Sequence, residues 1–191
     1  MFADYLSKLT ELLRAIEADK NKCLTPVEQM VEDVVIDIDI CKQQDKKLIW
    51  IGNGGSAAIA SHCALDYFRT GGFKSTCFND GPLLTCLGND FGYAAVFEKP
   101  LALFADAGDI LFAISSSGKS ENILRAVDTA RKKQCRIVTL SGFAVDNPLR
   151  AKGDMNFYAP AVQFGQVELA HSVLCHSFLD IYMAKQTGQR W

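Results

Sequence analysis

The chain has 191 residues, 49% of them hydrophobic and 22% charged, and its formal net charge is −2 at pH 7. These values are typical of globular proteins and exclude a disordered tail or a fibrous repeat. The near-neutral charge disfavours nucleic acid as the main partner. Apolar runs such as 48–51 and 110–114 are far shorter than the roughly 18 residues of a membrane span, and charged residues interrupt the N-terminus, unlike in a signal peptide. We expect one cytoplasmic domain, 1–191, that binds neither membrane nor nucleic acid.

Seven cysteines are spread along the chain, and no two of them form a CxxC pair. An odd number cannot all form disulfides, and most of these cysteines lie within apolar runs. Free cysteine in such surroundings behaves as a small buried hydrophobic residue. We therefore expect packed free thiols, which agree with a reducing compartment.

The first 45 residues are predicted to be helical. Apolar residues recur at helical spacing from Phe2 to Ile16. The segment 25–28, Thr-Pro-Val-Glu, has the pattern of a capping box and predicts the start of a second helix. The apolar faces of these helices, which extend to Ile38, exceed what one domain needs to cover its sheet. Residues 1–45 are therefore expected to pack against other copies in a homotetramer.

After residue 45 the pattern changes to short apolar runs that alternate with helical stretches. The runs predict strands at 48–51, 75–78, 109–115, 135–141 and 155–160, and helices fit at about 56–69, 93–106, 119–133 and 165–186. Strands that alternate with helices predict βαβ units with right-handed crossovers. The expected fold class is α/β, a doubly wound five-stranded parallel sheet with an N-terminal helical extension.

Two loops that follow predicted strands have the composition of anion-binding sites, and ligands of such sheets bind beyond the carboxyl ends of the strands. Residues 52–56 read Gly-Asn-Gly-Gly-Ser, a weak signal alone because the loop matches neither a nucleotide P-loop nor GxGxxG. Residues 115–120 hold four serines and a glycine directly before a helix. This pattern predicts a phosphate-binding loop, and the expected ligand is a phosphorylated small molecule rather than a nucleotide cofactor.

All three histidines accompany carboxylates. His62 and Asp66 are one helical turn apart, and both His171 and His176 follow Glu168 on the last predicted helix. Because helical histidines are mostly structural, the pattern alone favours a site role for His176 more than for His171. A helical rise of about 12 Å separates Glu168 from His176, so the two meet at one ligand only if Glu168 lies at the start of the helix.

Taken together, these motifs resemble those of the SIS (sugar isomerase) domain family and, within it, of the phosphoheptose isomerases. The matching segments are 52–56, 88–92, 108–111, 114–120 and 138–142, and the resemblance covers nearly the whole chain. It implies a flavodoxin-like SIS fold and a homotetramer with sites between subunits, often with bound zinc. It also implies conversion of sedoheptulose 7-phosphate to D-glycero-D-manno-heptose 7-phosphate for lipopolysaccharide or capsule heptose.

Carried over position by position, the resemblance implies the roles of individual residues. The implied substrate contacts are Asn53, Gly54, Ser56, Asp90, Ser115, Ser116, Ser117 and Ser120. The implied metal ligands are His62, Asp66, Glu168 and His176, and the last three also form the implied catalytic set. Nitrogen and oxygen ligands suit zinc, with manganese, iron or nickel as alternatives.

Two of these positions depart from better-known phosphoheptose isomerases. Asp66 stands where a glutamate acts as acid/base, and Glu168 stands where a glutamine is usual. Aldose–ketose isomerisation through a cis-enediol needs a base at carbon and a proton shuttle between oxygens. Either Asp66 or Glu168 could be that base, with His176 as the partner acid/base.

A second class of function stays open. SIS domains also serve as non-catalytic phosphosugar-binding modules, and one tetrameric relative binds the bacterial replication initiator. The full histidine–carboxylate set of this chain favours the isomerase, and measuring the metal content of the purified protein would distinguish the two classes.

Overall fold

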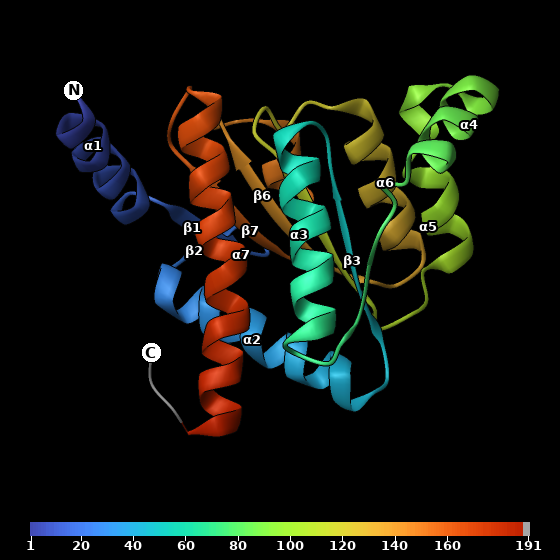
Figure 1. Cartoon of the computed structure of the whole chain (residues 1–191), viewed down its shortest axis with the longest axis horizontal. Coiled ribbons are helices and arrows are strands. Elements are labelled where there is room, and N and C mark those ends of the chain that lie inside the picture. Colours follow the sequence, from blue (N-terminus) through green and yellow to red (C-terminus); the bar gives the residue numbers. More distant parts are fainter. Residues whose placement is uncertain (189–191) are drawn as a thin grey trace.

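Seven strands form one sheet in this computed structural model, which describes residues 1–188 (Figure 1). The strand order is β2-β1-β7-β6-β5-β3-β4. The strands are β1 Glu17–Lys20, β2 Cys23–Thr25, β3 Lys47–Gly52, β4 Lys74–Cys77, β5 Ile110–Ser115, β6 Arg136–Gly142 and β7 Met155–Ala159. The helices are α1 Phe2–Arg14, α2 Val27–Gln43, α3 Gly55–Arg69, α4 Gly81–Phe91, α5 Glu98–Phe104, α6 Glu121–Lys132 and α7 Phe164–Thr187, with 3-10 turns η1 Tyr93–Ala95 and η2 Pro148–Ala151. The last three residues of the expected domain, 189–191, lie outside the described residues.

Five of the strands, β3 to β7, form the predicted parallel sheet. All side chains of β5 and β7 are buried, because helices cover both faces. On one face Trp50 stacks on Phe112 with ring centroids 3.9 Å apart, in a core shared with α2, α3 and α7. On the other face Ile49 and Ile51 pack with α5 and α6. The α/β fold class is therefore confirmed.

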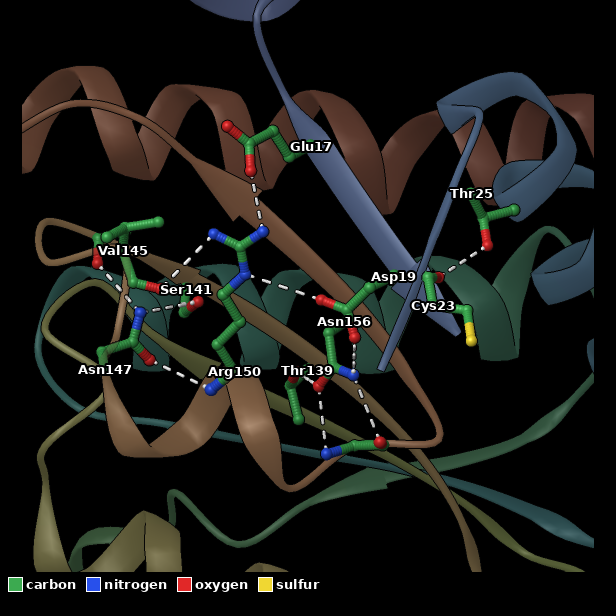
Figure 2. A network of polar contacts seen from close by, with 12 residues as sticks. Glu17, Asp19, Cys23, Thr25, Thr139, Ser141, Val145, Asn147, Arg150 and Asn156 are labelled. Atoms are coloured by element: carbon green, nitrogen blue, oxygen red, sulfur yellow. Dashed lines mark hydrogen bonds and ion pairs between the residues drawn. The ribbon is translucent and has the colours of Figure 1, made fainter. Parts of the chain in front are cut away.

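The sheet gains two antiparallel strands where helix was expected, so the prediction of continuous helical structure over residues 1–45 is wrong. β1 pairs with both β2 and β7, and residues Asn21 and Lys22 turn the hairpin with positive φ values of 51° and 68°. A two-residue loop with positive φ at both positions matches the twist of paired strands. The expected capping box is also wrong, because the Thr25 hydroxyl donates to the Cys23 carbonyl while Pro26 takes the N-cap position of α2 (Figure 2).

The predicted helix at 93–106 is replaced by α4, η1 and α5. Asp80 caps α4 by accepting a hydrogen bond of 3.1 Å from the Leu83 backbone N–H, and Pro82 lies in the first turn. Gly92 ends α4 with a φ of 79°. The chain then needs η1 to turn before α5 starts at Glu98, so the helical region begins earlier than expected and is interrupted.

Helices α3 and α7 lie side by side over the same face of the sheet and run in the same direction (Figure 1). The Tyr67 hydroxyl donates to the Cys175 carbonyl across this contact at 2.7 Å. Both helices begin at the edge where the parallel strands end. Residues about three turns into each helix, such as Tyr67 and Cys175, therefore lie near one another.

Candidate functional site

The first of the two predicted anion-binding loops, 52–56, connects β3 to α3. Gly54 has a φ of +56°, which a residue with a side chain rarely adopts, so the loop needs glycine there. The Ser56 side chain is buried in the first turn of α3. The free N–H groups of this helix start face the carboxyl edge of the sheet, where an anion is favoured.

The second loop, 115–120, connects β5 to α6 and is called the serine loop below. The Gly118 N–H donates to both the carbonyl and the hydroxyl of Ser115, at 3.0 and 3.2 Å. Ser116 Oγ is buried and, among the described residues, has no hydrogen-bond partner. An unsatisfied buried hydroxyl is costly, so this atom is suited to a ligand oxygen. Ser117 and Ser120 are partly exposed at the same turn.

Polar contacts from Asn147 and Leu149 support the serine loop on the side that faces the protein. Gly118 has a φ of +61°, and a Cβ at this position would lie 1.9 Å from Asn147 Oδ1. The Gly118 carbonyl accepts a hydrogen bond from the Leu149 N–H at 3.1 Å. Asn147 Nδ2 in turn donates to the Ser141 hydroxyl at 3.1 Å. The loop therefore rests on the segment that contains η2 and its N-cap Asn147, and only glycine fits at its tightest point.

The same segment connects to the N-terminal hairpin through a group of five residues shown in Figure 2. We call it the Arg150 cluster: Glu17, Asp19, Asn147, Arg150 and Asn156. Arg150 lies 2.7 Å from Glu17 and 3.5 Å from Asp19, and its backbone N–H donates to Asn147 Oδ1 at 3.0 Å. Asn156 Nδ2 donates to Asp19 Oδ1 at 2.9 Å. No sequence motif pointed to this cluster, because its members are up to 139 positions apart in the chain.

Two histidines and an aspartate meet where α3 and α7 pack together. His62 Nε2 lies 3.0 Å from Asp66 Oδ2, as the one-turn spacing predicts. His176 Nδ1 lies 3.9 Å from the same oxygen, and the two imidazole centroids are 5.1 Å apart. One ligand atom from each residue lies within 4.8 Å of the others. We call this group the histidine cluster; it is half-exposed, since 55% of the His62 side chain is accessible.

Glu168, which was predicted as the fourth metal ligand, is not part of the histidine cluster. A Cβ at Gly55 would be 2.3 Å from Glu168 Oε1, so the carboxylate packs against the start of α3. Glu168 is close to the start of α7, and His176 follows two turns later. The structure therefore brings together three of the four predicted metal ligands and places Glu168 beside the glycine loop.

His171 is fully buried and has a structural contact. Its Nε2–H donates to the Ser141 carbonyl at 3.1 Å, since a carbonyl can only accept. Burial lowers the pKa of His171 to about 4, so the imidazole is neutral at pH 7. Ser141 pairs with Ser115 across the sheet, so this contact anchors α7 beside the base of the serine loop.

Of the remaining predicted contacts, Asn53 is partly buried in a side-chain network and Asp90 is exposed. Asn53 forms two hydrogen bonds of 2.9 Å with Asn122, a residue that the sequence reading missed. The position of Asn122 in the first helical turn after the serine loop could have indicated that it belongs to the site. Asp90 Oδ1 accepts from the Asn89 side chain at 2.9 Å, and the Asp90 carboxylate raises the pKa of the Cys86 thiol.

The chain is similar to known proteins over most of its length. The family model described as "SIS domain" matches residues 4–142. The chain is 34% identical over 172 residues to a phosphoheptose isomerase of Helicobacter hepaticus, covering 86% of this chain and 85% of the relative. It is 38% identical over 144 residues to that of Sulfurimonas denitrificans, covering 72% and 73%.

A solved structure is similar over the same extent. The phosphoheptose isomerase of Neisseria gonorrhoeae superposes with a TM-score of 0.81 at 26% identity, covering 95% of this chain and 97% of that one. The sequence matches and the shared architecture together show that this chain belongs to the SIS domain family, within the group of the phosphoheptose isomerases.

Proposed function

We propose that the protein is an aldose–ketose isomerase of phosphorylated sugars that converts sedoheptulose 7-phosphate to D-glycero-D-manno-heptose 7-phosphate. One observation carries the proposal: the same fold combines a phosphate-type serine loop at the carboxyl end of β5 with a group of acid/base side chains where α3 and α7 pack together. The relatives that match at 33% to 38% identity are named phosphoheptose isomerases, which supports a seven-carbon sugar phosphate. The product would supply heptose for lipopolysaccharide or capsule.

In this proposal the serine loop binds the phosphate. Hydroxyls of Ser116, Ser117 and Ser120, together with N–H groups at the start of α6, would donate to phosphate oxygens. The unpartnered Ser116 Oγ supports this role, because a phosphate oxygen would satisfy it. The glycine loop, with Asn53 and Ser56, would then contact the sugar, and Asp90 would reach it from α4.

Proton transfer is assigned to carboxylates and a histidine on the paired helices α3 and α7. A base removes a proton from the carbon next to the carbonyl, and an acid/base moves a proton between the two oxygens of the enediol. We assign Asp66 as the base and His176 as its partner, because their reactive atoms lie 3.9 Å apart. Glu168, against Gly55, is the alternative base.

The donor set of the histidine cluster fits a divalent metal ion. His62 Nε2, Asp66 Oδ2 and His176 Nδ1 are nitrogen and oxygen donors grouped within 4.8 Å, and such ligands suit zinc. When bound, such an ion polarises the substrate oxygens as a Lewis acid. The three side chains would hold it, and metal analysis of the purified protein tests whether they do.

Isomerisation is tested directly by incubating the protein with sedoheptulose 7-phosphate and following ketose-to-aldose conversion by NMR. We expect conversion by the wild type and a loss of at least about 10²-fold in kcat in Asp66→Asn. Asp39→Asn is the matched control, since Asp39 is also a helical carboxylate with a partner one turn away, the Gln43 amide at 2.7 Å. Binding of the phosphosugar without conversion would instead indicate a non-catalytic binding module.

We further propose a homotetramer, with sites between subunits. α1 extends away from the sheet (Figure 1), and its Phe2 and Leu6 side chains are exposed. On α7, Leu169 and Val173 are exposed beside His176, around a surface depression of about 410 Å³. Apolar side chains in such positions are covered favourably by another copy. Sedimentation that shows a monomer at micromolar concentration would contradict the tetramer.

No helix within residues 1–188 is long and apolar enough to cross a membrane. All seven cysteines lie in this part of the chain and none of them forms a disulfide. Free thiols are usual in reducing compartments, which supports a cytoplasmic location.

A further inference from the structure

Three segments around the candidate site meet at one pair of side-chain amides. Asn53 lies in the glycine loop, Asn122 lies in the first turn of α6 directly after the serine loop, and Tyr93 lies in η1, three residues after Asp90. The Asn53 and Asn122 amides exchange two hydrogen bonds of 2.9 Å each. The Tyr93 hydroxyl donates to Asn53 Oδ1 at 3.0 Å. We call these three residues the amide junction.

A backbone contact fixes the orientation of the whole junction. The Ile123 N–H donates to Asn122 Oδ1 at 3.0 Å, so this atom must be the oxygen of the Asn122 amide. Asn122 Nδ2 then faces Asn53, and Asn53 must present its Oδ1 there and to Tyr93. Asn53 Nδ2 donates one hydrogen to Asn122 Oδ1 and keeps the second one free.

The two outer members differ in burial. Asn122 is only 3% exposed, so its amide would be left without water if Asn53 turned away. Tyr93 is 60% exposed, and only its hydroxyl takes part in the junction. Buried Asn122 therefore fixes the orientation of the Asn53 amide, and the exposed Tyr93 adds one hydrogen bond that favours the same orientation.

We infer that Asn122 and Tyr93 are positioning residues that hold the Asn53 amide so that its free N–H points to the sugar of the bound phosphosugar. This inference rests on the proposed isomerase function. The serine loop holds the phosphate by other groups, so the junction orients the sugar end of the substrate relative to an independently bound phosphate. Small misplacements of a bound substrate are costly in turnover.

The test uses two variants that add no charge near the serine loop. Tyr93→Phe removes only the hydroxyl and should lower kcat/KM for sedoheptulose 7-phosphate by about 3- to 10-fold. Asn122→Leu keeps a similar side-chain volume, while the Ile123 N–H keeps its bond to the Ser120 carbonyl. We expect Asn122→Leu to lower kcat/KM by about 10- to 100-fold.

Two further measurements separate positioning from a structural role. Inhibition by inorganic phosphate should stay within about twofold of the wild type in both variants, because the serine loop is intact. The double variant should match Asn122→Leu alone, since Tyr93 has no orienting effect once the Asn53 amide is free to turn. Tyr158→Phe, which deletes a 2.9 Å bond to the Phe143 carbonyl outside the junction, should leave kcat/KM unchanged.

The inference is overturned if Tyr93→Phe has wild-type kcat/KM, or if the two single effects simply multiply in the double variant. It is also overturned if phosphate inhibition weakens in parallel with turnover, because the junction would then act on the fold of both loops. Tyr93→Phe keeps the test valid should Asn122→Leu not fold, since Tyr93 lies at the surface. A wild-type protein that does not isomerise the substrate contradicts the proposed function itself.

Discussion

The Arg150 cluster and the histidine cluster are both rich in charged and polar groups, yet they are built in opposite ways. The Arg150 side chain is 13% exposed, contacts two carboxylates and lies 4.4 Å from the Tyr158 ring centroid. In the histidine cluster the His62, Asp66 and His176 side chains are 55%, 20% and 39% exposed, and of these three only His62 and Asp66 are within hydrogen-bond distance. The charged groups of the Arg150 cluster are paired with one another, whereas the histidine cluster keeps donor atoms that are free to bind a ligand.

Hydrogen-bond satisfaction agrees with this description of the Arg150 cluster. None of its buried side-chain atoms lacks a hydrogen-bond partner, whereas Ser116 Oγ in the serine loop is one of four buried side-chain atoms in residues 1–188 without one. Polar groups that are fully paired stabilise a fold, whereas groups with free capacity are suited to a ligand. Changes in the first cluster should therefore alter stability, and changes in the second should alter turnover.

The largest expected effect is at the histidine cluster. Asp66→Asn and His176→Asn should each lower kcat by at least about 10²-fold, because each removes a group that transfers a proton. Glu168→Gln should remain within about tenfold of the wild type, since the Glu168 carboxylate packs against Gly55 and not in the cluster. NMR assays of the three variants, with urea unfolding as a check on folding, measure these differences.

A larger loss of turnover in Glu168→Gln than in Asp66→Asn would identify Glu168, instead of Asp66, as the catalytic base. If Glu168→Gln abolishes turnover while phosphosugar binding persists and Asp66→Asn stays active, Glu168 removes the proton from carbon. Wild-type rates in all three variants would exclude the histidine cluster and Glu168 from proton transfer.

The next largest effect is on stability. Arg150→Met should reduce the free energy of unfolding by about 2–4 kcal/mol, because it leaves the buried Asp19 carboxylate without its cation. Turnover should change little, since Asn147 accepts from the Arg150 backbone N–H, which the variant keeps. Urea unfolding measures the loss.

Arg125→Met is the matched control for that experiment. Arg125 also pairs with a carboxylate, that of Glu98, but its side chain is 43% exposed. An exposed ion pair contributes about 0–1 kcal/mol, so this variant should unfold almost as the wild type does. Equal losses in the two variants would contradict the structural role of the Arg150 cluster.

The sequence predicted the parts of this contrast that depend on local pattern. Apolar runs predicted the five parallel strands, and the one-turn spacing of His62 and Asp66 predicted their contact. The phosphate-binding role of the serines in 115–120 stays a prediction. The hairpin was missed because β1 and β2, Glu-Ala-Asp-Lys and Cys-Leu-Thr, lack the alternating apolar pattern of a strand. Pairing with β7 and the Arg150 contacts stabilise them instead, and these partners are more than 130 positions away.

The candidate site shows the same limit. Helical spacing left open whether Glu168 and His176 meet at one ligand. In the structure α7 is continuous through both residues and keeps them about 12 Å apart along its axis. Packing against α3 then places Glu168 beside Gly55 and His176 beside His62. The Asn53–Asn122 pair joins positions 69 apart that share no motif. Long-range side-chain pairs of this kind depend on the finished fold, so no local pattern predicts them.

A third prediction concerns the pH dependence of stability and the buried His171, which is bonded to the Ser141 carbonyl. The pKa of His171 is lowered from 6.5 to about 4 by burial. Between these values the unfolded chain takes up a proton at His171 that the folded protein does not. Stability therefore falls as the pH falls through this window, by up to about 3 kcal/mol at its lower end, and this term is absent above pH 6.5.

Urea unfolding at pH 7 and pH 4.5 measures this effect, with His171→Gln as the comparison. Gln has no titrating group but can still donate an N–H to the Ser141 carbonyl. The wild type should lose more stability than the variant on acidification, and equal losses would contradict a buried, neutral His171.

The smallest expected effect is at the serine loop. The Ser117 hydroxyl accepts only a 3.3 Å hydrogen bond from the Lys119 N–H, and Ser120 begins α6 without a side-chain cap in the described structure. The double variant Ser117→Ala/Ser120→Ala should therefore fold normally. It should weaken phosphosugar binding by about 1–3 kcal/mol, because two donors to the phosphate are lost while the N–H groups of the helix start remain.

Titration calorimetry with sedoheptulose 7-phosphate and KM from the NMR assay measure this loss. Ser7→Ala is the control, because the Ser7 hydroxyl is exposed on α1 and contacts only Glu11, at 3.4 Å. Loss of stability without a change in KM would mean that the two hydroxyls belong to the fold, as the Arg150 cluster does. Unchanged KM and unchanged stability together would place the phosphate elsewhere along the sheet edge, and the backbone N–H groups of the glycine loop would be the next donors to test.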